Sequence, residues 1–463
     1  MKKLIEWSVF FCLSLTLSAT SHASRKVAII GGGMSGVAAL SHLSRFGNDP
    51  NLEIHLFEMQ ERLGGNASTQ FLENSDGELV PVDFGAQFFS EGGWDKYIQL
   101  QKDYDLFDEE VDLANVSVGL IIGEENSKRS YLETPSRSLR FISVRNVKKL
   151  LVLKKFLKYS RQFYVEKRKS KERVTVEDFL SELPDIKEKD KRNIILPFLS
   201  SILGTPMEET KKLSFFSLTH LVSFRPVHPL GKTDYQVPLI GMGGVVEKIA
   251  MLEKAKSSYP IHFHLSTFVK SVVYKREKDV YEISYNEKDL AEFDYVIMTT
   301  HASQTADILI EAEQELKDDL KSLPYITLRT VVHYDKDSSL ILGHPSHHLY
   351  NIAVNPKRGE VYNTINLEKI HPMYKGMFRT VVLNDDVYDK ISGEKFSVEF
   401  HHPLVTPFFL EKSKMIKQSI KDKKYPHLGP RLTLAGGWTK EHETQETAII
   451  SAEEALEELS LVE

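Results

Sequence analysis

The stretch RKVAIIGGGMSGVAALSHL (Arg25–Leu43) decides the fold class. Its VAII run is continuous, apolar and too short for a helix, which is typical of a buried parallel strand. Glycines then follow in the spacing G-x-G-x-x-G, and apolar residues recur at helical spacing from Val37 onward. These glycines are Gly31, Gly33 and Gly36. We expect a strand, a tight turn and a helix whose first amides, those of Met34 and Ser35, face a nucleotide pyrophosphate.

A second predicted strand, EIHLFE (Glu53–Glu58), supports the nucleotide interpretation. It ends in an acid about 20 residues beyond the last glycine, where a carboxylate accepts hydrogen bonds from the adenosine ribose. Glu58 is therefore a predicted cofactor contact. The alternative is a plain strand–helix–strand unit with a chance glycine turn.

The residues after Glu58 distinguish between the dinucleotides. EMQERLGGNAST resembles the E-x(3)-R-x-G-G segment of the flavin amine oxidase superfamily, which includes amine oxidases, protoporphyrinogen oxidase, phytoene desaturases and prenylcysteine oxidase. The resemblance implies that Arg62, Gly64 and Gly65 hold the pyrophosphate of FAD. A guanidinium forks onto phosphate, and glycines let the backbone come close. Many members carry a further arginine where this chain has Asn66.

Later segments resemble the same family along most of the chain. PVDFGAQFF (81–89) is similar to the segment that lines the flavin, and RLTLAGGWTKEHETQETAII (431–450) is similar to the strand, glycine turn and helix at the ribityl chain. The chain departs from the pattern at Gly437, where the family usually has an acid, and at Glu446, near the usual helix-opening glycine. The resemblance assigns the remaining FAD contacts to Gly85, Ala86, Val269, Gly436, Gly437, Thr447 and Ala448.

We predict an α/β protein with a Rossmann-like FAD-binding domain assembled from discontinuous segments, and an inserted α+β substrate lobe. The predicted segments are a signal peptide (1–23), the first FAD-binding part (24–123), the helical part of the substrate lobe (124–235), the second FAD-binding part (236–310), the sheet part of the substrate lobe (311–425) and the C-terminal FAD-binding segment (426–463). LRTVVHYDKDSSLI (328–341) resembles a branch of bacterial amine-oxidase-like flavoproteins.

The first residues have the pattern of an export signal. Lys2 and Lys3 precede a short apolar run, and Ser21-His22-Ala23 offers small residues for cleavage, so we expect a periplasmic or secreted protein. The alternative is an uncleaved membrane anchor. The single cysteine, Cys12, lies inside this signal, which excludes a cysteinyl-flavin bond in the mature chain and favours non-covalent FAD.

Composition limits the classes of protein and of binding partner that remain possible. The 463 residues are 41% hydrophobic with a net charge of −6, as in a folded globular protein without a nucleic-acid partner. Histidines are grouped, but without a metal-binding helix motif, so no metal site is predicted. The groups are His344, His347 and His348, and His401 and His402.

Two middle segments have open interpretations. Residues 145–173 are expected to be helical with lysines between apolar positions, which fits either a basic face on anionic lipid or a solvated helix. Residues 194–224 are apolar and aromatic, which fits a substrate tunnel or the core of a helical lobe.

No acid–base residue follows from a motif, and the resemblance implies an FAD-dependent oxidoreductase. We expect hydride abstraction from an amine or an apolar substrate, with oxygen or another acceptor re-oxidising the flavin. Trp438, Phe88 and Gln87 are candidates beside the flavin, although a tryptophan next to a glycine turn also fits packing. The alternatives are a lipid, isoprenoid or thioether oxidoreductase with an apolar tunnel, and a non-catalytic FAD-binding protein.

Overall fold

In the computed structural model, strands from three distant parts of the chain form one parallel sheet. Its order is β19 (Leu432–Leu434), β13 (Tyr295–Met298), β1 (Arg25–Ile30), β2 (Leu52–Phe57) and β9 (Ile261–His264). The predicted nucleotide turn follows β1 in the middle of this sheet. The predicted fold class, α/β with a Rossmann-like domain built from discontinuous segments, is thereby confirmed.

The structure describes residues 24–122, 130–134, 143–167, 174–223, 234–335, 348–355, 359–382, 385–393, 395–440 and 444–462. The predicted signal peptide, His344, His347 and the last residues of the predicted basic helix (168–173) lie outside these ranges. Of the helices described, none is long and apolar enough to cross a membrane.

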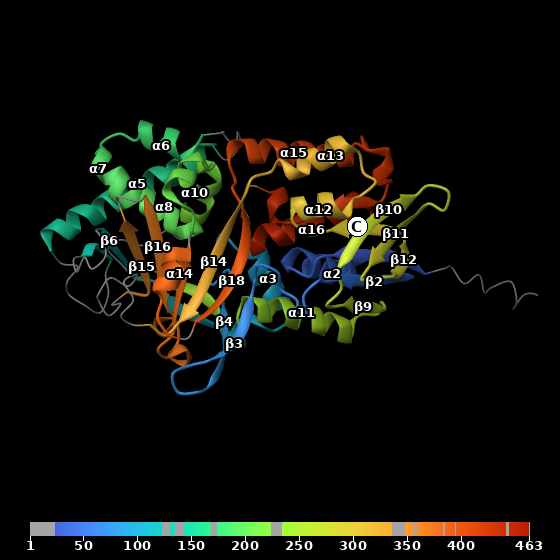
Figure 1. Cartoon of the computed structure of the whole chain (residues 1–463), viewed down its shortest axis with the longest axis horizontal. Coiled ribbons are helices and arrows are strands. Elements are labelled where there is room, and N and C mark those ends of the chain that lie inside the picture. Colours follow the sequence, from blue (N-terminus) through green and yellow to red (C-terminus); the bar gives the residue numbers. More distant parts are fainter. Residues whose placement is uncertain are drawn as a thin grey trace, which may run out of the picture.

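The two faces of the parallel sheet have different covers (Figure 1). Alternate side chains such as Ile29 and Ile54 pack against α2 (Met34–Phe46), α11 (Met242–Lys256) and α16 (Gln445–Glu458). The intervening side chains, Ile30 and Phe57 among them, pack against an antiparallel sheet. Its strands are β10 (Val269–Lys275), β11 (Val280–Tyr285) and β12 (Asp289–Phe293). A strand buried on both faces explains the uninterrupted apolar run of β1.

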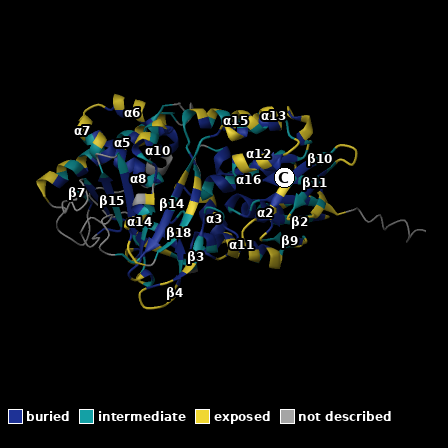
Figure 2. Ribbon diagram, viewed as in Figure 1, coloured by how far each residue is buried: buried dark blue, intermediate teal, exposed yellow. Residues whose placement is uncertain are grey.

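The other lobe is built on a seven-stranded mixed sheet. Its order is β18 (Lys395–Pro403), β14 (Tyr325–His333), β17 (Phe378–Val382), β16 (Glu360–Asn366), β15 (Tyr350–Asn355), β6 (Val118–Ile122) and β7 (Ser130–Glu133). Helices α5 (Val144–Lys167), α8 (Leu196–Leu203) and α10 (Phe215–Ser223) share its core. Figure 2 shows buried residues along both sheets and on the inward faces of the helices.

Three elements lie outside the lobe predicted for them. Helix α13 (Gln314–Lys321) falls in the predicted sheet part of the substrate lobe, yet it buries Leu316 and Leu320 in the core that contains Ile30 and Phe57. Strand β6 falls in the first predicted FAD-binding part, yet it pairs with β15 in the seven-stranded sheet. Helix α15 (Pro407–Lys421) falls in the predicted substrate lobe, yet it buries Phe409 and Ile416 in the core beneath the parallel sheet. Amphipathic pattern predicts that such a helix is buried on one side, but not which sheet receives it.

The remaining elements of the described chain are short. The remaining strands are β3 (Thr69–Glu73), β4 (Leu79–Asp83), β5 (Val111–Asn115) and β8 (Asp234–Pro238). The remaining helices are α3 (Asp95–Asp103), α4 (Phe107–Glu110), α6 (Val176–Glu182), α7 (Glu188–Asp190), α9 (Met207–Lys212), α12 (Ala302–Ile308) and α14 (Asp385–Lys390), with a π-helical turn η2 (Lys191–Ile195) and the 3-10 turns η3 (Leu367–Lys369), η4 (Pro372–Tyr374), η5 (Pro426–Leu428) and η6 (Gly437–Thr439).

Candidate active site

A cavity of about 720 Å³ is lined by residues of both lobes. Most of the predicted cofactor contacts lie in its wall, together with the three predicted candidates beside the flavin. These residues are Gly31, Gly33, Met34, Ser35, Glu58, Arg62, Gly64, Gly65, Gly85, Ala86, Val269, Gly436, Gly437 and Ala448, with Gln87, Phe88 and Trp438. Segments more than 400 residues apart in sequence thus meet at one site.

Gly36 and Thr447 are not part of the cavity wall. A Cβ atom on Gly36 would lie 1.9 Å from the carbonyl oxygen of Gly31, so this glycine lets α2 pack on β1. Thr447 is the third residue of α16, and its amide hydrogen-bonds to the Thr444 hydroxyl in a capping box. Both residues shape the site through the backbone.

The N-terminus of α2 forms one end of the cavity. Gly33 precedes the helix without making a side-chain cap, and the first turn contains no acid. Gly33 also pairs with Gly64, so two glycine turns lie side by side. The first amides of a helix, left unpaired and free of acidic side chains, are a binding site for an anion such as a pyrophosphate.

Glu58 lies at the carboxyl end of β2, where it is 8% exposed. Its Oε2 accepts a hydrogen bond from the amide of Gly32 at 2.7 Å, and its Oε1 accepts one from the amide of Gln60 at 2.8 Å. The carboxylate is therefore fixed against the glycine turn, as a ribose acceptor must be. Arg62 lines the cavity nearby and donates to the Ser68 hydroxyl.

Thr267 and Phe268 line the cavity beside the predicted Val269. The Thr267 amide donates to the carbonyl of Glu58 at 2.9 Å, which joins this segment to the end of β2. Only Val269 was predicted from the sequence, because nothing local in a loop between two strands signals contact with a distant turn.

Arg379 on β17 supports the segment predicted to line the flavin. Its guanidinium donates to the carbonyl of Phe84 at 2.7 Å, to that of Gly85 at 2.6 Å and to Oε1 of Gln87 at 3.0 Å. Burial lowers the pKa of Arg379 to about 10. No motif marks this arginine, since its partners lie almost 300 residues earlier.

Asp83, next to the same segment, is a buried carboxyl group. It accepts hydrogen bonds from the amide of Met242 at 2.9 Å and from the Thr69 hydroxyl at 2.5 Å. Burial nevertheless raises the pKa of Asp83 to about 6, although Arg379 favours the charged form. The carboxyl group therefore links β4 to the start of α11 behind the flavin-lining segment.

Trp438 makes two hydrogen bonds and lies close to Gly436, and these interactions favour a packing role. Its indole Nε1 donates to the carbonyl of Thr300 at 3.0 Å, and its own carbonyl accepts from the Ser413 hydroxyl at 3.0 Å. A Cβ atom on Gly436, where φ is +137°, would lie 2.9 Å from the indole. The ring is 2% exposed although it contributes to the cavity wall.

Glu446, where the sequence departs from the family pattern, hydrogen-bonds to the N-terminus of another helix. The Glu446 carboxylate accepts hydrogen bonds from the amides of Lys96 and Tyr97, at 3.1 and 2.9 Å. These are the second and third residues of α3, so the carboxylate caps that helix from another part of the chain. Burial raises the pKa of Glu446.

The part of the cavity on the side of the seven-stranded sheet is mostly apolar. Its aliphatic and aromatic residues are Val116, Val118, Phe198, Ile202, Leu203, Leu213, Leu218, Leu328, Ile365, Val381, Val398 and Phe400. The predicted apolar segment at 194–224 therefore contributes both to this wall and to the core, where Leu199 and Phe215 are buried.

Few polar side chains interrupt that apolar wall. Asn363 donates to the Ser201 carbonyl at 2.9 Å and to the Tyr350 hydroxyl, while its Oδ1 has no partner among the described residues. His402 also lines the cavity, and burial lowers its pKa to about 4, so its imidazole is neutral at pH 7. Among the described residues of the wall there is no lysine.

The grouped histidines do not come together as a metal site in the described residues. His402 lines the cavity, whereas the adjacent His401 hydrogen-bonds to Thr327 at the surface, because successive residues of a strand point to opposite faces. His348 lies 3.8 Å from Glu133 in another part of the lobe.

Comparison with known proteins decides the family. The model of flavin-containing amine oxidoreductases matches residues 34–337, well over half of the chain. The chain belongs to this family. The enzyme is therefore an FAD-dependent oxidoreductase, as the resemblance of its motifs implied. A comparison with curated protein sequences found no match.

Solved structures of low identity have the same fold. A proposed protoporphyrinogen oxidase from Exiguobacterium sp. 255-15 is 16% identical with a TM-score of 0.63, over 95% of this chain and 99% of that one. Putrescine oxidase bound to putrescine is 12% identical with a TM-score of 0.63, over 94% and 99%. Cyclohexylamine oxidase from Brevibacterium oxydans IH-35A is 15% identical with a TM-score of 0.59, over 94% and 100%.

The residues of the cavity fit FAD. The free amides of α2 and Arg62 suit the pyrophosphate, and Glu58 suits a ribose hydroxyl. A Cβ on Gly33 would meet Gly65 at 3.8 Å, so the missing side chain leaves this face of the turn open toward the second glycine turn. The predicted departure at Gly437 does not close the site, because Gly437 itself lines the cavity.

Proposed function

We propose that this FAD-dependent oxidoreductase removes a hydride from an apolar substrate, an amine or another apolar molecule, bound against the seven-stranded sheet. The observation that supports the proposal is the continuity of one cavity from the nucleotide turn to the apolar wall. Bound FAD supplies the hydride acceptor, and oxygen or another acceptor re-oxidises it. The chain itself excludes water and orients the substrate.

An amine would bind in its neutral form. The carboxylates in the wall are Glu58, Asp307 and Glu399, and each already has partners. Glu58 holds two amides, Asp307 pairs with Lys321 at 2.7 Å, and Glu399 pairs with Arg329 at 2.6 Å. None of these three carboxylates is thus without a partner, whereas Oδ1 of Asn363 has none among the described residues and can accept an N–H or O–H from a neutral substrate.

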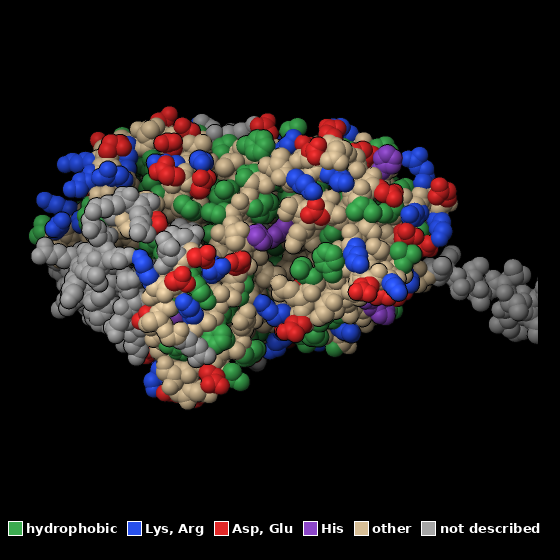
Figure 3. All heavy atoms as spheres, in the orientation of Figure 1, with side chains coloured by type: hydrophobic (Ala, Val, Ile, Leu, Met, Phe, Trp, Pro, Cys, Tyr) green, Lys and Arg blue, Asp and Glu red, His purple; other side chains and the backbone are tan. Residues whose placement is uncertain are grey.

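A lipid, isoprenoid or thioether substrate is the second candidate. It is favoured by the aliphatic wall of Ile202, Leu203 and Leu218 and by the surface of α5. Lys and Arg side chains gather at the end of the molecule where α5 and α7 lie (Figure 3). The exposed cations of α5 are Arg145, Lys148, Lys154, Lys158 and Arg161, and Leu151 beside them is 48% exposed. A basic helix with exposed apolar residues suits the surface of an anionic membrane.

Export and non-covalent flavin complete the proposal. The N-terminal pattern supports cleavage before Ser24 and a periplasmic or secreted location. Mass spectrometry of the mature chain tests the cleavage, and release of yellow flavin on denaturation tests the attachment. Flavin that stays with the denatured chain would contradict non-covalent binding.

The functional test is anaerobic reduction of the bound flavin. We expect bleaching of the yellow oxidised flavin by a hydrophobic amine, a prenyl thioether or an unsaturated lipid, and peroxide release if oxygen is the acceptor. Ile202→Trp, which narrows the apolar wall, should raise KM without changing FAD affinity. Leu290→Trp on β12, where the side chain is 57% exposed and outside the cavity wall, should leave both unchanged. Flavin that none of these substrates reduces would contradict the proposal.

A further inference from the structure

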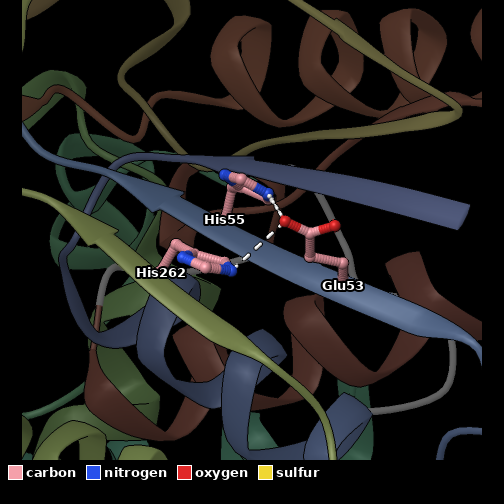
Figure 4. A group of neighbouring side chains, drawn as sticks. All are labelled: Glu53, His55 and His262. Carbon is pink, nitrogen blue, oxygen red and sulfur yellow. Dashed lines mark hydrogen bonds and ion pairs between the residues drawn. The ribbon is translucent and has the colours of Figure 1, made fainter. Parts of the chain in front are cut away.

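A cluster of histidines and one glutamate lies between β2 and β9, away from the cavity (Figure 4). Nε2 of His55 is 2.9 Å from Oε1 of Glu53, and Nε2 of His262 is 3.2 Å from the same oxygen. The two strands are parallel, with His55 opposite His262. Because side chains alternate along a strand, Glu53, His55 and His262 all project from one face of the sheet.

We propose that Glu53, His55 and His262 bind a divalent transition metal ion, with zinc as the ion that best matches two imidazoles and one carboxylate. One ligand atom from each side chain lies within 4.8 Å of the others. In a tetrahedral zinc site the bonds are about 2.0–2.2 Å, so neighbouring ligand atoms lie about 3.3–3.5 Å apart. The contact of His262 with Oε1, at 3.2 Å, is close to this separation, whereas that of His55, at 2.9 Å, would have to lengthen slightly around an ion. Water would complete the coordination.

His264 supplies the support that a metal-binding histidine requires. Its Nε2 is 2.9 Å from Nδ1 of His55, on the side of the ring away from Glu53. If His55 donates its Nδ1 hydrogen to His264, the lone pair of its Nε2 points toward Glu53 and is free for a metal. Stacking of His264 on Phe57, with ring centroids 4.4 Å apart, fixes the supporting ring.

The charges and the exposure of the cluster are compatible with an ion that enters from solvent. The side chain of His262 is 47% exposed and that of Glu53 is 21% exposed, which leaves an entry path. The cation nearest to Glu53 is Lys26, whose Nζ is 3.9 Å from the other carboxylate oxygen, Oε2. The Ser24 hydroxyl also donates to Oε2. Oε1 is therefore left to face the two imidazoles.

The bound ion would stabilise the pairing of β2 with β9. Strand β9 is at the edge of the parallel sheet and leads directly into Thr267 and Val269 of the cofactor cavity. An ion shared between β2 and β9 would fix this edge strand in register without contacting the cofactor. None of the four side chains of the cluster lines the cavity. Metal binding is thus separable from the oxidoreductase chemistry.

The test is binding of Zn²⁺ to the full FAD-loaded chain after treatment with EDTA, measured by calorimetry and by competition with a chromophoric chelator. We expect one Zn²⁺ per chain. His262→Ala and Glu53→Gln should weaken binding at least about tenfold, and His264→Phe, which keeps the stacking on Phe57 but loses the hydrogen bond, about 10- to 100-fold.

The matched control is His427→Ala. Nδ1 of His427 is 3.1 Å from Glu313, so this variant removes a surface histidine–glutamate pair that forms no three-ligand cluster with other described residues. It should bind Zn²⁺ as the wild type does. Far-UV circular dichroism and flavin content verify that each variant is folded. Absence of Zn²⁺ binding, or binding unchanged in His262→Ala, would overturn the proposal and leave only a hydrogen-bonded chain from His264 through His55 to Glu53.

Discussion

Gly33→Ala separates cofactor binding from folding. Gly33 has φ −74° and ψ −176°, a conformation that any residue adopts. An added Cβ would lie 3.8 Å from Cα of Gly65 and 3.9 Å from the Gly64 carbonyl oxygen, both ordinary contact distances. The FAD-free protein should therefore be about as stable as the wild type. The entropic gain of about 0.4–1 kcal/mol from alanine opposes the cost of placing alanine at the N-cap of α2, where glycine is preferred.

The same methyl group occupies the space between the two glycine turns where the pyrophosphate would lie. Forcing one additional carbon into a filled site costs about 1–3 kcal/mol. Since about 1.4 kcal/mol corresponds to a factor of ten, FAD should bind about 5- to 150-fold more weakly. The loss should appear only in the presence of the cofactor.

FAD affinity is measured by titrating the flavin-free chain and following flavin fluorescence, and stability by urea unfolding without FAD. Gly244→Ala in α11, with its Cβ 3.4 Å from Ile240, is the matched control and should not change FAD binding. Gly36→Ala places a Cβ 1.9 Å from a backbone oxygen and should destabilise even the FAD-free chain. Wild-type FAD affinity in Gly33→Ala would refute the placement of the pyrophosphate at this turn.

Three further predictions concern the residues behind the cofactor. Burial raises the pKa of Asp83 to about 6, so ionisation of this carboxyl group is disfavoured in the folded chain. As the pH rises from about 4 to above 6, the wild type should therefore lose about 3 kcal/mol of unfolding free energy relative to the Asp83→Asn variant. Urea unfolding across this pH range measures the difference, and a difference independent of pH would contradict the assignment. Arg379→Met leaves two carbonyl oxygens and one amide oxygen without their hydrogen-bond donor. It should cost about 1–3 kcal/mol for each oxygen that stays buried and unpaired, and it should change the flavin spectrum; a stable variant with the wild-type spectrum would show that the arginine is dispensable. Trp438→Phe removes the hydrogen bond to Thr300 and should lower the free energy of unfolding by about 1 kcal/mol, while the rate of flavin reduction stays the same. A large loss of reduction rate at unchanged stability would instead show that Trp438 contacts the substrate.

The nucleotide-binding half of the site could be predicted from the sequence because its chemistry is local. One strand, one glycine turn and the first amides of one helix are adjacent in the chain, and the second strand brings Glu58 to the same edge. The backbone itself requires glycine at Gly31, where φ is +115°, and at Gly36, where a Cβ would lie 1.9 Å from the Gly31 carbonyl oxygen. Gly33 is instead expected to be required by the bound cofactor. Because this geometry involves residues that are close in the sequence, it produces a residue pattern that predicts the turn before the fold is known.

Only the tertiary structure determined which residues from distant segments contact one another. Arg379 lies beneath Gly85 because β17 occupies the middle of the second sheet, and Glu446 caps α3 because α16 packs beside it. His55 and His262 are separated by about 200 residues, so a search for grouped histidines could not unite them. A residue's type limits what it can bond, but its partner is set by the pairing and packing of whole elements, and the sequence around any single residue does not encode that pairing.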